Sequence, residues 1–313
     1  MTDFSRLTAC PGVTPASGAT ASEFDTFGAQ TGLTIPPQLR RLYEHCNGLV
    51  IDGQRGSLRI LSLNEVADCV HNSQKLGTSG VWGYFPFTDL NDSNPHCVCC
   101  AGPVSGYIVR VNHDDIARIE YRSLGSFLDT ICKVLEAPTA ELDDGPSLWE
   151  LPQELHLTTS DRTSDDVETA QRLLAFATTL EEGSTERADA ERWAITLFSE
   201  NEVSEVAQFL DNGDEYQRAT ALAKLSRITS PQAQSAIQQH RQEVRAFSRQ
   251  VVDALKSAGL TVAEVHDDCP RLEPGTVWLN VPMFFTDRRS PTIMIDIVKR
   301  ARELIALNTQ GTA

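Results

Sequence analysis

Apolar residues recur at helical spacing between residues 35 and 51, and this stretch predicts the local frame of the N-terminal half. The positions i, i+3, i+4 and i+7 that form one buried helix face are Leu39, Leu42, Tyr43 and Cys46. Pro36 and Pro37 suit the helix start, because proline has a helical φ and its missing N–H is not needed in the first turn. Asn47 and Gly48 are expected to end the helix in a left-handed conformation, and a strand follows directly.

The rest of the first 137 residues predicts further helices and strands. Residues 1–20 are predicted to be a loose arm, and Ser22 is predicted to cap a first helix that ends at Gly32. Alternating or aromatic runs predict strands over residues 57–61, 81–87, 97–100, 107–112 and 116–121. Helices are predicted over residues 63–71 and after Ser123 or Ser126. Tight turns between neighbouring strands imply an α+β fold with a mostly antiparallel sheet flanked by helices.

The second half of the chain has a different pattern. Residues 138–165 contain Pro138, Pro146 and Pro152 and predict a linker, with Trp149 as an aromatic tether. Apolar residues then repeat with a period of 3.6 over residues 165–180, 187–199, 203–210, 215–228 and 231–256. Residues 245–310 are interpreted as a small helix-strand-strand-helix cap. The predicted domains are residues 1–137, the linker 138–165, and a helical-hairpin region with its cap over residues 166–313.

Charge and composition narrow the class of protein. The net charge is −16, and residues 138–169 alone carry 9 acidic and one basic side chain. Such a field repels phosphate backbones, so nucleic-acid binding is disfavoured, whereas a basic protein partner would be attracted. No apolar run approaches the length of a membrane span, and the N-terminus lacks the pattern of a secretory signal, so a cytoplasmic location is expected.

Candidate chemistry is sparse. The eight cysteines are expected to be free and mostly buried thiols. Cys97, Cys99 and Cys100, with His96 and His113, form the best candidate for a metal, but alternation along a strand places Cys100 on the opposite face, and no metal or other cofactor is predicted. The sequence shows no nucleophile elbow, phosphate loop or zinc-binding helix motif, and no catalytic residue is predicted.

The first 137 residues resemble the SMI1/KNR4 family, also called SUKH. The resemblance rests on the helix that leads to Asn47 and Gly48, on the aromatic stretch from Trp82 to Phe87, and on the helix that contains Phe127. The framework residues that it carries over are Pro36, Leu39, Tyr43, Asn47, Gly48, Phe85 and Phe127. It implies an α+β domain without chemistry of its own, whose bacterial members include immunity proteins that bind toxins. The helical half resembles HEAT-type repeats.

Acidic and aromatic side chains at the predicted sheet edge are the candidate partner-binding residues. They are Asp89, Asp92, Asp114, Asp115, Glu120, Trp82 and Tyr84. The carboxylates could pair with the Lys and Arg side chains of a toxin, and the aromatics could anchor an interface. For each carboxylate the alternative is ordinary turn chemistry, and for the aromatics it is a core position.

The function predicted from the sequence is non-catalytic immunity. In this hypothesis the protein neutralises a cognate toxin, a basic protein domain encoded nearby, by binding and occluding it. The alternative is an intracellular scaffold or regulatory module of SMI1/KNR4 type that binds an endogenous partner. A metal-dependent enzyme built on the Cys97 hairpin is a third hypothesis.

Overall fold

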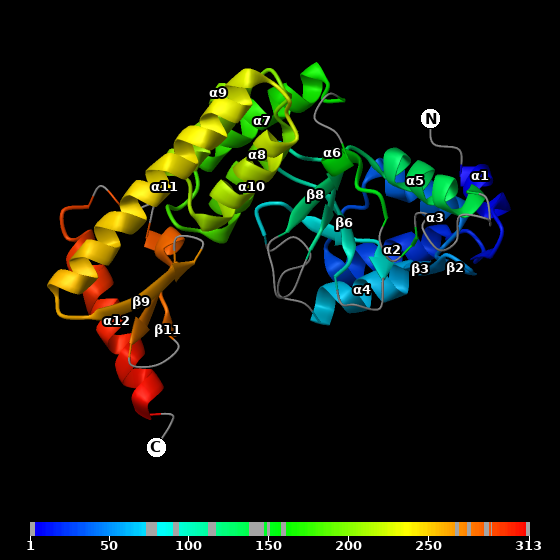
Figure 1. The fold of residues 1–313 in the computed structure, drawn as a ribbon. Helices are drawn as coiled ribbons and strands as arrows, with labels where there is room; N and C mark the ends of the chain where they lie inside the picture. Colours follow the sequence, from blue (N-terminus) through cyan, green and yellow to red (C-terminus); the bar gives the residue numbers. More distant parts are fainter. Residues whose placement is uncertain are drawn as a thin grey trace. The chain divides into compact units, whose positions relative to one another are not determined.

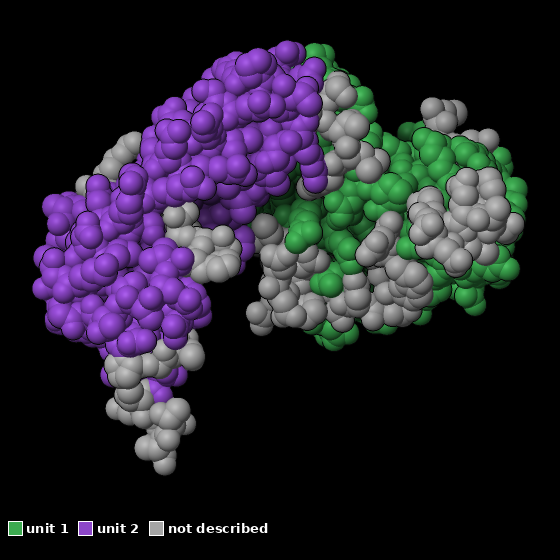
Figure 2. All heavy atoms as spheres, in the orientation of Figure 1, with its two compact units in different colours: residues 1–199 green, residues 200–313 purple. Residues whose placement is uncertain are grey.

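A computed structural model describes the chain as a mixed α+β protein (Figure 1). The described residues are 4–72, 80–89, 94–111, 117–137, 147–148, 151–157, 161–266, 269–273, 277–284, 288 and 290–310. Packing groups the chain into unit 1, residues 1–199, and unit 2, residues 200–313 (Figure 2). The sequence-based division at residues 138–165 stays a prediction, and Trp149 lies outside the described residues.

The N-terminal part of unit 1 confirms the predicted α+β class. Its helices are α1 (Phe4–Ala9), α2 (Ala21–Thr31), α3 (Pro37–His45), α4 (Leu63–Asn72) and α5 (Leu124–Glu136). Its strands are β1 (Val13–Pro15), β2 (Leu49–Gly53), β3 (Gly56–Ile60), β4 (Tyr84–Pro86), β5 (Thr88–Asp89), β6 (His96–Cys99), β7 (Ile108–Arg110) and β8 (Arg118–Tyr121). They form a first sheet in the order β1-β2-β3-β5 and a second sheet in the order β4-β6-β7-β8, with antiparallel pairing throughout the described ladders.

Helix α3 forms as predicted, but it ends differently. Leu39, Leu42 and Tyr43 are fully buried in the main core. The C-cap is Cys46 in an extended conformation, so the left-handed cap predicted at Asn47 and Gly48 is wrong. Gly48 nevertheless needs to be glycine, because its φ is +96° and an added Cβ would lie 3.1 Å from the Ser62 nitrogen.

Residues 4–20 fold onto the domain, so the loose arm predicted for residues 1–20 is wrong over this described part. Strand β1 pairs with β2, and Leu7 of α1 is 1% exposed. The Arg6 guanidinium forms ion pairs with Asp129 at 2.6 Å and with Glu136 at 2.7 Å, both on α5. These contacts are distant in sequence, which is why local composition did not reveal them.

The helix caps also refine the prediction. Thr20, not Ser22, caps α2: its side chain accepts from the Glu23 N–H, and Glu23 reaches back to the Thr20 backbone. Ser123 caps α5 in the same reciprocal way with Ser126. The predicted end of α2 at Gly32 is confirmed by its left-handed φ of +66°.

A helical hairpin completes unit 1. Helix α7 (Ser164–Ala177) packs against α8 (Thr185–Leu197), and the short α6 (Glu154–Leu157) contacts β8. The Trp193 ring of α8 lies 4.6 Å from that of Trp82, and the Phe176 ring of α7 lies 5.6 Å from Trp82. The Trp193 Nε1–H donates to the Ala117 carbonyl at 3.0 Å. The hairpin therefore packs on residues of the second sheet and its flanking loops.

Unit 2 contains α9 (Val203–Asn212), α10 (Glu215–Ser226), the long α11 (Pro231–Ser257) and α12 (Ile293–Gln310). Its sheet has the order β11-β10-β9, with β9 (Thr261–His266), β10 (Cys269–Glu273) and β11 (Val277–Trp278), and a 3-10 turn, η2 (Val281–Phe284), follows. The small C-terminal sheet agrees with the predicted cap, with β10 as an additional strand. Phe247, Val251 and Leu255 of α11 share a core with Leu272 and Ile297. None of the described helices combines the length and apolarity needed to cross a bilayer.

Candidate functional site

Strand ends bring two chain segments together at one end of the second sheet. His96 at the start of β6 lies opposite Arg110 at the end of β7. Beside this pair, the Val111 N–H donates to the Pro95 carbonyl at 3.0 Å. The chain segments that precede Pro95 and follow Val111 in sequence therefore adjoin this end of the sheet. We call this end the loop edge; its described residues are Asp89, Pro95, His96, Arg110 and Val111.

Of the predicted partner-binding carboxylates, one is described at the loop edge. Asp89 closes β5 opposite Arg59, and it is half-buried. Asp92, Asp114 and Asp115 lie outside the described residues, in the segments that adjoin the loop edge. Their role as partner-binding residues stays a prediction.

Glu120 does not lie on an exposed edge, which corrects its predicted placement. Its side chain is 2% exposed, and one carboxylate oxygen lies 3.0 Å from His96 Nε2. The other oxygen accepts from Gln153 Nε2 at 2.8 Å, and His96 Nδ1 lies 3.2 Å from Thr88 Oγ1. Buried polar atoms require such partners, so this chain of contacts joins β5, β6, β8 and the segment before α6.

Trp82 and Tyr84 are also buried, at 2% and 8% exposure, so neither is an exposed anchor. The physical reason is the α7–α8 hairpin: Trp193 and Phe176 pack on Trp82. Burial raises the pKa of Tyr84 well above its ordinary value, and the negative charge of Asp189 on α8 contributes. The alternative interpretation, a core position for these aromatics, agrees with the structure.

The side chains of Thr88, His96 and Glu120 are hydrogen-bonded in the same sequence as the nucleophile, the base and the orienting carboxylate of a catalytic triad. A catalytic hydroxyl must reach a substrate, yet Thr88 is 0% exposed and His96 is 2% exposed. As described, the trio has no access to a substrate, and its hydrogen bonds serve to satisfy buried polar groups.

The cysteines of strand β6, Cys97 and Cys99, are part of the buried interior. Cys97 and Cys99 are 0% exposed, and burial raises the pKa of both thiols well above the ordinary value. Cys46 is likewise buried, with its pKa raised to about 11 by desolvation. Within the described ranges, no three His, Cys, Asp or Glu side chains are grouped as a metal site. His113 lies outside them.

A cluster of polar side chains around Arg122 is not among the features predicted from the sequence. The Arg122 guanidinium forms three hydrogen bonds with the Asp166 carboxylate on α7, at 2.7, 2.9 and 3.0 Å, and an ion pair with Glu154 on α6. The Tyr107 hydroxyl also donates to Asp166 at 3.2 Å. Burial opposes ionisation of Asp166, but Arg122 and the Thr163 backbone N–H hold its pKa below the ordinary value. The only signal in the sequence was the spacing of Thr163 and Asp166, which is typical of a helix cap.

Four of the seven framework residues carried by the resemblance lie in the main core. Leu39, Tyr43, Phe85 and Phe127 are each 0% exposed. The Phe85 ring lies 5.5 Å from Phe27 and 6.4 Å from Tyr43, so α2 and α3 pack on the second sheet from the side of Phe85. They hold the fold and do not mark a partner surface.

The fold defines an α+β domain with an apolar core, in which the buried His96, Glu120 and Thr88 form hydrogen bonds with one another or with neighbouring residues. Residues 18–130 match the sequence model of the SMI1 / KNR4 family (SUKH-1), so the N-terminal half carries a domain of this family. The family includes immunity proteins, and its domain is generally a non-catalytic binding domain. The match does not extend over the helical half, where the HEAT-like resemblance stays a prediction. No curated protein matches the chain.

Proposed function

We propose that this protein is an immunity protein that neutralises a cognate toxin by direct binding and occlusion. The observation that carries the proposal is the SMI1/KNR4 domain over residues 18–130, a domain whose relatives bind toxin partners. In this proposal the protein makes and breaks no covalent bond, and the toxin is a basic protein domain encoded nearby.

The loop edge is the proposed contact surface. Asp89, Asp92, Asp114 and Asp115 are the proposed partner-binding residues, because their carboxylates can pair with the Lys and Arg side chains of a toxin. Asp92, Asp114 and Asp115 belong to segments that adjoin the loop edge, where the Pro95 carbonyl and the Val111 N–H meet. The net charge of −16 favours encounter with a basic partner over a nucleic acid.

Co-expression with the polypeptide encoded next to this chain tests the proposal. We expect a stable complex in size-exclusion chromatography and protection of cells from that polypeptide. Absence of a complex with every neighbouring polypeptide would contradict it. Capture of an unrelated endogenous partner by the full chain, without a complex with any neighbouring polypeptide, would instead favour the scaffold alternative.

The contact surface has its own test. The triple variant Asp92→Asn, Asp114→Asn, Asp115→Asn should slow association by about tenfold, since charge complementarity acts mainly on the association rate. The control changes three exposed acids elsewhere in unit 1, Asp25→Asn, Asp52→Asn and Glu181→Gln. Equal slowing in both variants would mean that net charge, not the loop edge, determines association.

A further inference from the structure

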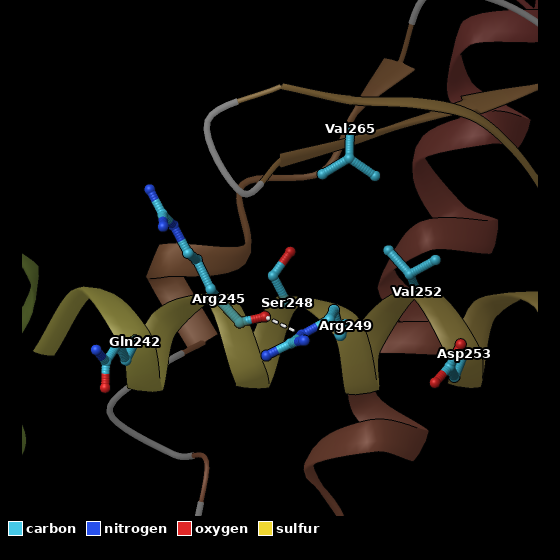
Figure 3. Close-up of a pocket in the computed structure, with 7 residues that line it drawn as sticks. All are labelled: Gln242, Arg245, Ser248, Arg249, Val252, Asp253 and Val265. Carbon is cyan, nitrogen blue, oxygen red and sulfur yellow. Dashed lines mark hydrogen bonds between the residues drawn. The ribbon is translucent and has the colours of Figure 1, made fainter. Parts of the chain in front are cut away.

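Unit 2 contains a surface groove that the proposed immunity function does not use. It lies between α11 and β9 and has a volume of 670 Å³, within the range of ligand and peptide pockets (Figure 3). Val252 from α11 and Val265 from β9 extend into the space between the two elements, and Ser248 lies at its floor. Val265 is 50% exposed, so the groove offers apolar surface to solvent.

One wall of the groove belongs to β9, which is an edge strand of its sheet. The order β11-β10-β9 places β9 at the end of its sheet, and no strand among the described residues pairs with its outer side. Edge strands are usually protected by proline, by lysine or by a covering element. The β9 sequence, TVAEVH, is rich in β-branched residues and has a single full charge, Glu264, which pairs with Arg271 of β10 at 2.8 Å. This edge can therefore accept another strand through its backbone.

The other wall is basic. Arg245 and Arg249 line the groove, and Arg241 continues the same helix face one turn earlier. All three side chains are exposed, and none forms an ion pair with a carboxylate of the described residues; the Arg249 Nε–H donates to the Arg245 carbonyl. Like charges four residues apart on a helix repel one another, and a bound anion would relieve that repulsion. We call Arg241, Arg245 and Arg249 the α11 strip. It is basic, although the chain as a whole carries a net charge of −16.

We infer that the groove between α11 and β9 binds an extended acidic segment of a protein partner as an added strand. Carboxylates of the segment pair with Arg245 and Arg249, and an apolar side chain fills the space between Val252 and Val265. Asp253 lines the groove one turn beyond Arg249 and repels acids there, so the acidic residues of the segment lie at the Arg245 end.

Fluorescence polarisation with the full chain tests the inference. The probe is a labelled ten-residue peptide that begins with three aspartates and continues with alternating valine and threonine. We expect saturable binding, and about tenfold weaker binding by Arg245→Glu, Arg249→Glu, since the ion pairs become repulsions. The control, Lys299→Glu with Arg300→Glu on α12, carries the same charge change on exposed positions outside the groove and should stay within about twofold.

Two further probes separate strand addition from simple charge attraction. A probe with asparagine in place of the aspartates should bind as weakly as the aspartate probe binds the double variant. N-methylation of alternate probe residues removes every second N–H donor, and one of the two alternating patterns should abolish binding.

Three results with the peptide probes would overturn the inference. They are no saturable binding of the aspartate probe, equal weakening by the α12 control, and unchanged binding of both N-methylated probes. A dimer of this chain that dissociates in Arg245→Glu, Arg249→Glu would assign the groove to a second copy and would also overturn it. The toxin test does not involve this groove, so the two proposals can fail separately.

Discussion

Asn47 connects three elements of the SMI1/KNR4 domain through a single side chain. Its Oδ1 accepts from the Leu63 N–H at the start of α4, at 2.9 Å, and its Nδ2 donates to Glu23 on α2 at 3.0 Å. Asn47 itself follows the C-cap of α3. These two hydrogen bonds require a side chain with both a donor and an acceptor. A left-handed helix end alone would not require such a side chain.

Asn47→Ala should lower the free energy of unfolding by about 1–3 kcal/mol, because it leaves a half-buried helix N–H and the Glu23 carboxylate without this partner. Urea denaturation measures the loss. Asn72→Ala, at an exposed position at the end of α4, is the control and should change stability by less than about 0.5 kcal/mol. Equal losses in the two variants would contradict the connecting role.

Asp166 is the second residue on which stability depends. Its side chain is 1% exposed, and it accepts hydrogen bonds from Arg122, Tyr107 and the Thr163 backbone. Asp166→Asn should cost about 3–5 kcal/mol, as expected when one partner of a buried ion pair is removed. Glu168→Gln is the control, because Glu168 is exposed on the same helix and its ion pair with Arg172 is long, at 3.9 Å.

Ionisation of Asp166 should also make the stability of the fold depend on pH. The pKa of folded Asp166 lies below its ordinary value of 3.8, so the stability that its ionised form contributes is present above that value. It is lost as the pH falls through the depressed folded pKa. Unfolding measured between pH 5 and pH 2 should therefore show a steeper acid loss for the wild type than for Asp166→Asn. Parallel curves would contradict this assignment.

At the scale of elements, hydrophobic periodicity predicted those parts of the fold that local sequence determines. Helix α3 and the ladder of β6 with β7 lie where the apolar pattern placed them. Strand β1 could not be predicted, since Val13–Pro15 is mostly exposed and forms only by pairing with β2. A core position for Trp82 and Tyr84 was one of two alternatives, and the sequence alone could not decide between them, because the residue that packs on Trp82, Trp193, belongs to a helix far along the chain.

The candidate site was predicted only in part, for the same physical reason. Strand alternation places a side chain on one of two faces but does not say whether that face is covered. Glu120 was therefore expected on an exposed edge, whereas His96 and Gln153 enclose it. The Arg122 cluster joins the end of β8 to α6 and α7. Residues so far apart in the chain produce no repeating pattern in the sequence from which their contact could be predicted.

Trp193→Ala tests whether the α7–α8 hairpin covers the second sheet. Removing this ring, which is 1% exposed, should cost about 3–5 kcal/mol and should expose Trp82 to solvent. Acrylamide quenching of tryptophan fluorescence measures that exposure. Tyr216→Ala, at 55% exposure on α10, is the control and should leave the quenching unchanged. Unchanged quenching in Trp193→Ala would contradict the packing of the hairpin on Trp82.

At the scale of the whole molecule, charge is distributed unevenly. The chain carries a net charge of −16, yet α11 displays three exposed arginines, Arg241, Arg245 and Arg249, for which the described residues provide no ion pair, and two of them line the groove beside β9. Acidic surface favours a basic partner at the loop edge, whereas the α11 strip favours an acidic segment. The two proposed surfaces therefore attract partners of opposite charge, and each can be changed without altering the other.

The central claim is the proposal that the loop edge of the SMI1/KNR4 domain binds a toxin. The most direct measurement is the association rate constant with the toxin encoded nearby, by stopped-flow fluorescence at two salt concentrations. The account predicts that raising the salt slows association by the wild type, and that the Asp92→Asn, Asp114→Asn, Asp115→Asn variant is slow at both concentrations. A rate that neither salt nor these substitutions change would contradict it.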